Sequence, residues 1–278
     1  MQTAGRKHLC RSSFLRLGQS LRRARRVREM VKKELLLIPR KIPEIRWQRR
    51  TEMRRATETL AVLLLLFTVA ASAQKVKIDG NLGKERLLFN GKDFCGWTYF
   101  LADPNVKMED VWSIDGDKGI LICKGRPAGY IRTVANFTNY ILKLEWRWAP
   151  EDKGGRNSGV LLRMAGADKI WPKSIEAQLM SGSAGDFWLI DGVNLDTDPA
   201  RINPNAPTNR IKAKMVEKPI GEWNEYEIIV DGDHVVLKIN GQIVNEGTGA
   251  EVVPGKICLQ SEGAEIHFRN IRLIPILK

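Results

Sequence analysis

The chain has 278 residues and a formal net charge of +13, which would fit a nucleic-acid-binding protein if the charge were spread along it. The excess lies at the N-terminus, because residues 1–73 hold 18 Lys and Arg against 5 Asp and Glu, and the remainder holds 27 of each. A neutral remainder offers no basic stripe to a phosphate backbone, so the composition argues against a nucleic-acid partner.

Residues 53–73 have the pattern of a secretory signal peptide. A basic start at Arg54 and Arg55 precedes an apolar run over residues 60–71, and Ala71-Ser72-Ala73 supplies the small residues of a cleavage site. The run is shorter than the roughly 20 residues that a membrane-spanning helix needs. We therefore expect a secreted or periplasmic protein with no stable membrane span, cleaved by a Sec-type signal peptidase near Ala73.

The Arg-rich residues 1–52 precede this export signal, which is an unusual place for a functional segment. We interpret them as a mis-called upstream extension ahead of a true start at Met53, or as a disordered basic segment. The alternative is a basic arm for a membrane or nucleic acid around "LRRARRVREMVKKELLL". In either case we predict that residues 74–278 form a single domain.

Alternation of apolar and polar residues with a period of two dominates the second half of this domain, as in half-buried strands. Asn240-Gly241 between two such segments is a strong signal for a type I′ hairpin. No sustained helical period appears, so we predict an all-β sandwich of two antiparallel sheets. The expected strands are "YILKLEWRW" (140–148), "SGVLLRM" (158–164), "SIEAQLM" (174–180), "EYEIIV" (225–230), "HVVLKIN" (234–240), "QIVNEG" (242–247), "KICLQS" (256–261) and "AEIHFRNIRLIPI" (264–276).

Residues 191–210 break the alternation for about twenty residues, and loops of that length are usually functional or disordered. Asn194, Asp196 and Asp198 alternate there as oxygen donors that could meet Ca²⁺, although a solvated loop is the default interpretation. The three cysteines after residue 73 allow at most one disulfide and are expected to be buried. Trp223, in "GEWNEYEI", is expected in the core.

The strand from Ser174 carries the candidate site. Period two places Glu176 and Gln178 on one face, while Ile175 and Ala177 face the core. An acid and an amide side by side on one sheet face suit the hydroxyl groups of a sugar.

Neighbouring residues extend this site. Asn157 and Arg163 share one parity on the preceding strand and would join Glu176 if the register is suitable. Trp171 and Trp188 flank the strand and could stack on pyranose rings. The structural alternative is an ordinary charged strand face with an Arg–Glu cross-strand pair and tryptophans in the core or at its rim.

Several motifs together resemble a known family. They are "RLLFNGKDFCGW" (86–97), "LEWRW", "NSGVLLRM", "WPKSIEAQLMSGSAGDFW" (171–188), "KPIGEWNEYEIIVDGD", "VVLKINGQIVNEG", "GKICLQSEG" and "IHFRNIRLIPI". The order and content of these blocks, from Arg86 to Ile276, are similar to the DUF1080 family, described as 3-keto-disaccharide hydrolase, or 3-keto-glucoside-1,2-lyase and 3-keto-2-hydroxy-glucal hydratase.

The resemblance implies a concanavalin A-like jelly roll that cleaves 3-keto-glycosides. A ketone at C3 acidifies the proton on C2, so a base can remove it, the C1 substituent is expelled, and the resulting glucal is hydrated. Such a reaction needs a base, an acid and a stabiliser for the enolate oxygen. The substrate would be an oligosaccharide or glycoside, oxidised upstream by a glycoside 3-dehydrogenase.

The resemblance and the strand face together give each residue a hypothetical role. Glu176 is the candidate base or metal-positioning carboxylate, and Gln178 and Asn157 would hold hydroxyls or the carbonyl. Arg163 is the candidate enolate stabiliser, so Glu176, Arg163 and Gln178 form the expected catalytic set. Further substrate-binding candidates are Trp171 and Trp188 as walls, with Lys173 and Asp186 at the ends of the strand.

Three points stay open at this stage. A divalent metal, calcium or a transition metal, is an optional cofactor, and with only His234 and His267 after residue 73 a His-rich zinc site has little support. The family often has a Gly-x-Tyr-Gly stretch where this chain has "SGSAGDFWLIDG", which leaves the substrate and the balance of lyase and hydrolase open. The alternative from another class is a non-catalytic, lectin-like carbohydrate-binding module, because the same fold serves both.

Overall fold

The structure, a computed structural model, describes residues 76–278. The predicted extension (1–52) and signal peptide (53–73) lie outside the described residues, so both stay predictions. In the described part, no helix is long and apolar enough to cross a bilayer.

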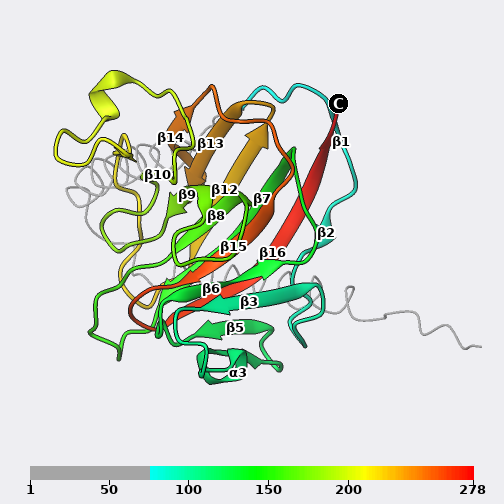
Figure 1. The fold of residues 1–278 in the computed structure, drawn as a ribbon, viewed down its shortest axis with the longest axis vertical. Coiled ribbons are helices and arrows are strands. Elements are labelled where there is room, and N and C mark those ends of the chain that lie inside the picture. Colours follow the sequence, from blue (N-terminus) through cyan, green and yellow to red (C-terminus); the bar gives the residue numbers. More distant parts are fainter. Residues whose placement is uncertain (1–75) are drawn as a thin grey trace, which may run out of the picture. The chain divides into compact units, whose positions relative to one another are not determined.

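The first sheet is built around the long C-terminal strand β16, drawn in red in Figure 1. Its strand order is β14-β13-β12-β7-β16-β5-β4, with β1 and β2 also paired to β16, and every pairing is antiparallel. Its strands are β1 (Asn81–Leu82), β2 (Arg86–Leu87), β4 (Trp112–Asp115), β5 (Ile120–Cys123), β7 (Tyr140–Trp148), β12 (Asn224–Asp231), β13 (His234–Ile239), β14 (Gln242–Gly247) and β16 (Ile266–Leu277).

The second sheet has the order β11-β10-β9-β8-β15-β6-β3, and it is also antiparallel throughout. Its strands are β3 (Trp97–Leu101), β6 (Gly129–Thr133), β8 (Gly159–Ala165), β9 (Lys173–Gln178), β10 (Phe187–Ile190), β11 (Asn209–Arg210) and β15 (Lys256–Ser261). Two short helical turns, α3 (Met108–Val111) and η1 (Pro199–Arg201), complete the described elements.

One main apolar core lies between the inner faces of the two sheets. Strand β7 contributes Leu142, Leu144 and Trp146 to it, while the intervening Lys143 and Glu145 face outward. This alternation follows from the pleat of a strand, which sends successive side chains to opposite faces. The predicted all-β jelly-roll sandwich of two antiparallel sheets is therefore confirmed.

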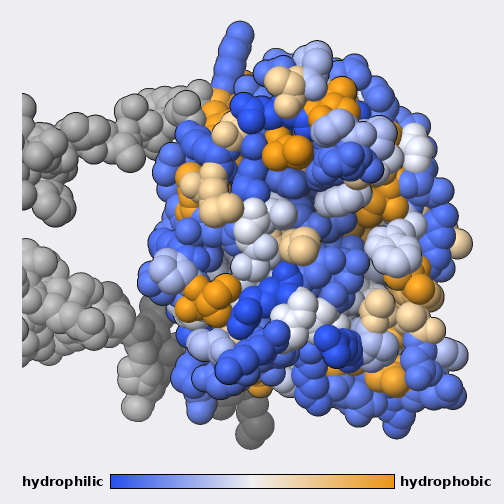
Figure 2. Space-filling view, turned by 90° about the vertical axis from the view of Figure 1, so that its left-hand side faces the viewer, coloured by the Kyte–Doolittle hydropathy of each residue, from blue (hydrophilic) through white to orange (hydrophobic). Residues whose placement is uncertain are grey.

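The strands expected from residue 140 onward are all present, with ends shifted by a few residues. The hairpin at Asn240-Gly241 also has the expected form, because both residues have positive φ, 50° and 79°, and Ile239 pairs with Gln242. The segment 191–210 is not wholly irregular, since it contains η1 and β11. Figure 2 shows the side of the domain that carries this segment as largely hydrophilic, with hydrophobic residues in separate patches.

Trp223 is not in the core, contrary to expectation. It is half-buried on the outer face of the first sheet, where the guanidinium groups of Arg147 and Arg269 lie 4.7 and 4.1 Å from its ring centre. Its position just before β12 gives it the parity of outward-facing residues, and cation–π contacts with the two arginines hold it there.

The three cysteines of the described part are free thiols. Cys123 and Cys258 are buried, as predicted, whereas Cys95 is exposed in the turn before β3. In the described part, the sandwich is therefore held by its apolar core and strand pairing without a disulfide.

Candidate functional site

Strand β9 follows the predicted alternation. Ile175 and Ala177 belong to the core between the sheets, whereas Glu176 and Gln178 project from the opposite, outer face of the second sheet. Both polar side chains are nevertheless buried, because neighbouring strands and loops surround them. A buried carboxyl group beside a buried amide is costly unless partners or a function account for it.

Glu176 is the most perturbed acid of this face. It is 4% exposed, and its Oε1 has no hydrogen-bond partner among the described residues. Burial raises the pKa of the Glu176 carboxyl well above its ordinary value, and the nearby charge of Glu262 adds to this effect. Both causes disfavour the carboxylate relative to the neutral acid.

Gly159 provides the space that Glu176 occupies. Gly159 pairs with Gln178 on β9, and an added Cβ would lie 2.2 Å from Oε1 of Glu176 and 2.3 Å from Oε1 of Gln260. The carboxyl group of β9 and the amide of β15 therefore meet over the one position of β8 that has no side chain.

Three buried acceptor atoms on this part of the sheet have no partner within residues 76–278. They are Oε1 of Glu176, Oε1 of Gln260 and Oδ1 of Asn157. Asn157 lies two residues before the start of β8, and its parity with Gly159 places it on the same face. Most buried polar atoms in native proteins are hydrogen-bonded, so three unpaired acceptors from β9, β15 and the segment before β8 mark a place where a ligand with several donors would fit.

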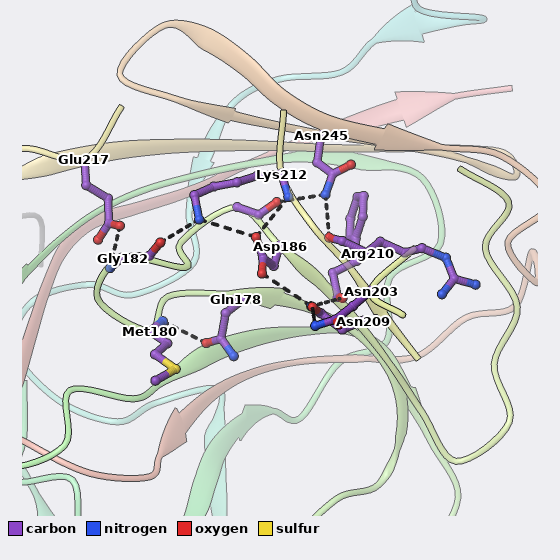
Figure 3. A network of polar contacts seen from close by, with 12 residues as sticks. Gln178, Met180, Gly182, Asp186, Asn203, Asn209, Arg210, Lys212, Glu217 and Asn245 are labelled. Carbon is purple, nitrogen blue, oxygen red and sulfur yellow. Dashed lines mark hydrogen bonds and ion pairs between the residues drawn. The ribbon is translucent and has the colours of Figure 1, made fainter. Parts of the chain in front are cut away.

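The amide of Gln178 is held in a defined orientation. Its Oε1 accepts hydrogen bonds of 2.8 Å from the backbone N–H groups of Leu179 and Met180, which Figure 3 shows in part. The two bonds assign the oxygen to that side, so Nε2 points away from the backbone turn. In the described part of the chain, Nε2 makes no hydrogen bond, which leaves a fixed donor beside the unpaired acceptors.

Arg163 does not join this face, which corrects the prediction made for it. The pairing of β8 with β9 shifts between Leu162 and Ala165, and Arg163 sits in this bulge with a φ of 49°. The bulge reverses the parity on which the prediction depended, so the guanidinium turns toward the other sheet.

The guanidinium of Arg163 is instead a structural connector. It donates to the carbonyl oxygens of Thr138, Glu251 and Gly232 and to Oδ1 of Asn139, at 2.7–3.2 Å. Arg163 is 6% exposed, so these bonds satisfy a buried charge at the end of the sandwich.

Lys173 and Asp186 also have structural partners. Lys173 forms an exposed ion pair of 2.7 Å with Glu251 and has the parity of the inward-facing residues of β9. Asp186 is buried and accepts a bond of 2.9 Å from the backbone N–H of Lys212 and a longer one from Asn209. The structure therefore places neither side chain beside the carboxyl group of Glu176.

The network around Asp186 shapes the loop that follows β9, as Figure 3 shows. Lys212 reaches the carbonyl oxygen of Gly182 at 2.7 Å, and Glu217 accepts the N–H of Gly182 at 2.9 Å. This is the "SGSAGDFW" stretch in which the chain departs from the family pattern. Its conformation is set by the segment 212–217 from both sides.

The two tryptophans lie at different places on the site. Trp188 on β10 is directly opposite Glu176 and half-buried, so its role as a wall stays a prediction. Trp171 is 53% exposed, and its indole N–H bonds to the carboxyl group of Glu262.

The sequence interpretation missed Gln260 and Glu262. They follow Cys258 with period two, so "KICLQSEG" already contained the signal that all three share the outer face. What it did not contain was the position of β15 beside β8, which is a long-range pairing.

Metal-ligand clusters are not evident in residues 76–278, where no group of three His, Cys, Asp or Glu side chains converges. Of the oxygen donors in the long loop, Asp198 caps the turn η1 by accepting from the backbone N–H of Ala200, while Asn194 bonds to Gly249. The polar side chains around Glu176 that could act as ligands are the Glu176 carboxyl group itself and neutral amides, with Glu262 nearby.

Two hollows of about 380 and 440 Å³ lie elsewhere, on the outer face of the first sheet. The first is lined by charged residues of β7, β12 and β16, such as Lys143 and Glu227, which are ion-paired with one another or with neighbours. The second surrounds Trp223. Neither is lined by a buried carboxyl group without a hydrogen-bond partner, so we place the candidate site at Glu176.

Comparison with protein families identifies one domain. Residues 84–274 match the model of the "3-keto-alpha-glucoside-1,2-lyase-like domain". The match confirms the family resemblance expected from the motifs and covers the sandwich except for β1 and the last three residues of β16. The comparison with curated proteins gave no match.

Solved structures with a similar fold include enzymes and a binding module. A provisionally named glycosyl hydrolase from Parabacteroides distasonis is 20% identical, with a TM-score of 0.49, over 70% of this chain and 94% of its own. A β-glucanase from Bacillus licheniformis is 12% identical, with a TM-score of 0.48, over 72% and 99%. The carbohydrate-binding module CBM66 from Bacillus subtilis is 12% identical, with a TM-score of 0.45, over 64% and 94%. At these values none of them indicates what this chain binds.

Proposed function

Because this chain belongs to the 3-keto-α-glucoside-1,2-lyase-like family, we propose that it is a carbohydrate-active enzyme that cleaves 3-keto-glycosides at the outer face of its second sheet. The reaction removes the C2 proton, expels the C1 substituent and hydrates the resulting 2-hydroxy-3-keto-glucal. The ketone at C3 makes this possible because it stabilises the carbanion at C2 as an enolate.

One observation carries the proposal. The unpaired buried acceptors of Asn157, Glu176 and Gln260 share a face with the indole of Trp188. A sugar presents hydroxyl donors around its ring and an apolar face of C–H groups, so it matches both features. A charged strand face without a ligand would instead have its polar atoms paired or in water.

Gln178 supplies the donor that the ketone requires. Its Nε2 is oriented by the two backbone bonds to its oxygen and is not used by another residue of the described part. A fixed donor next to the C3 oxygen stabilises the enolate more than the ketone, because negative charge develops there during the reaction. Such a donor contributes roughly 10²–10³ in rate.

Glu176 is the proton-transfer residue at the centre of the site. The hypothesis from the sequence made it the base, but burial without a hydrogen-bond partner favours the neutral acid. We therefore revise its role: Glu176 gives a proton to the oxygen of the leaving group. A positioned acid is worth roughly 10²–10⁴ in rate.

Incubation of the domain from residue 74 with a 3-keto-disaccharide tests the proposal. Release of the second sugar, with formation of the 2-hydroxy-3-keto-glucal or of 3-keto-glucose, is the expected result. The parent disaccharide without the ketone should not be cleaved, because its C2 proton is not acidic. No release from the 3-keto-disaccharide, with the sugar bound but unchanged, would instead support the lectin-like alternative, for which the 53% exposed ring of Trp171 provides a platform.

The cellular setting belongs to the same proposal. The signal-peptide pattern of residues 53–73 favours secretion or a periplasmic location. The substrate must then come from a glycoside 3-dehydrogenase, since an unmodified glycoside lacks the ketone. Fractionation of cells that express the full chain, with N-terminal sequencing of the product, checks the expected cleavage after Ala73.

A further inference from the structure

Glu262 is a second acid at the candidate site. It follows β15 with the parity of Cys258 and Gln260, both on the outer face of the second sheet. The charge of Glu262 reaches Glu176, and Glu262 itself is only half-buried. The two carboxyl groups therefore come from different strands, β9 and the end of β15, and lie on the same face of the second sheet.

The elimination needs two proton transfers on neighbouring atoms of the sugar, one from C2 and one to the oxygen on C1. A single carboxyl group in one protonation state cannot perform both. Resting on the proposed function, we propose that Glu262 is the base that takes the C2 proton, while Glu176 is the acid that protonates the leaving oxygen.

The surroundings of the two groups support this division. Burial raises the pKa of the Glu262 carboxyl group, which suits a base that must hold the C2 proton, and the indole N–H of Trp171 partly opposes this effect by bonding to the carboxylate. Glu262 is half-buried and so keeps contact with water. Glu176 has no hydrogen-bond donor in the described part, and an acceptor, Oε1 of Gln260, lies over the same glycine, Gly159. These surroundings disfavour a carboxylate at Glu176 relative to the protonated acid.

The protons taken and given by Glu262 and Glu176 balance over the elimination and the hydration. In the elimination, the Glu262 carboxylate takes the proton from C2, the C1–O bond breaks, and the Glu176 carboxyl group gives its proton to the departing oxygen. In the hydration, the Glu176 carboxylate takes a proton from water, whose oxygen adds to C1, and Glu262 returns its proton to C2. Both carboxyl groups then have their starting protonation states, and no other reactant is needed.

The experiment separates the two steps by choice of substrate. It uses a 3-keto-α-glucoside with a 4-nitrophenyl group, which leaves without help from an acid, and one with a methyl group, which needs the acid. A third compound, 1,5-anhydro-3-keto-glucitol, has no leaving group, so it reports only exchange of the C2 proton with deuterium from the solvent. Glu262→Gln, Glu176→Gln and the control Glu265→Gln, whose carboxyl group bonds to His267 of the first sheet, are compared with the wild type.

Glu262→Gln should slow cleavage of both glycosides and the exchange reaction, each by roughly 10²–10⁴. Glu176→Gln should slow the methyl glycoside by a similar factor, leave the nitrophenyl glycoside within about tenfold of the wild type, and retain exchange. Thermal unfolding of each variant distinguishes a lost group from a lost fold, and Glu262→Asp provides a second folded variant with a displaced carboxylate.

Exchange at the wild-type rate in Glu262→Gln and Glu262→Asp would overturn the inference, as would loss of exchange in folded Glu176→Gln. A wild-type protein that neither cleaves the keto-glycosides nor exchanges the C2 proton would overturn the proposed function itself. The two failures are therefore distinguishable.

Discussion

The carboxyl oxygen Oε1 of Glu176 and the amide oxygen Oε1 of Gln260 meet over Gly159, although they come from strands on either side of it. Strand β8 lies between β9 and β15, and only glycine leaves both oxygens room, because an added Cβ would lie 2.2 and 2.3 Å from them. The missing side chain of Gly159 is thus part of the site, and a substitution there displaces the acid without removing it.

Gly159→Ala should lower kcat/KM on a 3-keto-glycoside by roughly 10²-fold, because a shift of about 1 Å in a reacting group costs that much. The measurement is steady-state cleavage with both the methyl and the nitrophenyl leaving group. Gly116→Ala is the matched control, since a Cβ at Gly116 meets no atom within 4 Å. Full activity of Gly159→Ala, with an unchanged fold, would mean that the position of the Glu176 carboxyl group is not critical.

The burial of Glu176 also predicts how stability depends on pH. Because the folded-state pKa of Glu176 is raised above its unfolded value, the folded protein binds the proton more tightly, and this contribution to stability is complete below the unfolded pKa. It is lost as the pH rises from about 4.5, the ordinary value, through the raised folded pKa. Glu176→Gln removes the proton equilibrium and therefore this dependence.

Urea unfolding of the wild type and of Glu176→Gln from pH 4.5 to 9 measures the difference. The free energy of unfolding of the wild type should fall relative to that of the variant by up to about 1.4 kcal/mol per pH unit until the folded pKa is passed. Parallel curves over the whole range would show that Glu176 is not held neutral by the fold.

Strand β9 shows how far the sequence could predict the site. The alternation from Ser174 to Gln178 depends only on local geometry, and the structure places Ile175 and Ala177 inside and Glu176 outside, as expected. The resemblance then supplied the chemistry, which no periodicity contains. The short strands before residue 140 were not predicted, since runs of four or five residues between glycines give little periodic signal.

Arg163 shows which feature of the site local strand parity could not predict. A bulge adds a residue to one strand and reverses the faces of all side chains beyond it, and its position depends on the partner strand. Gln260 and Glu262 were missed for a related reason, because β15 joins β8 from about one hundred residues away. Local parity predicts faces well, but the residues that meet on a face depend on register.

The buried hydrogen bonds of Arg163 predict that its removal lowers the stability of the protein. Arg163→Ala should lower the free energy of unfolding by roughly 3 kcal/mol or more, because it leaves several buried oxygen acceptors without a donor. Lys173→Ala, which removes only an exposed ion pair, should cost less than about 1 kcal/mol. The measurement is urea unfolding of both variants.

The activity of Arg163→Ala per folded molecule should be close to that of the wild type, assayed at a temperature where the variant remains folded. A folded Arg163→Ala variant with activity reduced 10²-fold or more would restore the catalytic role that the sequence suggested. A loss of stability alone agrees with the hydrogen bonds to the loop carbonyls.

Trp188 stands opposite Glu176 and provides the aromatic wall of the site. Trp188→Ala should raise KM for a 3-keto-glycoside by roughly 2- to 12-fold, corresponding to about 0.5–1.5 kcal/mol for an aromatic contact. The effect on kcat should be smaller, because the ring contacts the sugar in the ground state and in the transition state alike.

Trp188→Phe keeps an aromatic face and should recover most of the affinity. A drop in kcat with unchanged KM in Trp188→Ala would instead show that the indole positions the acid beside it, since β10 and β9 pair directly at these two residues.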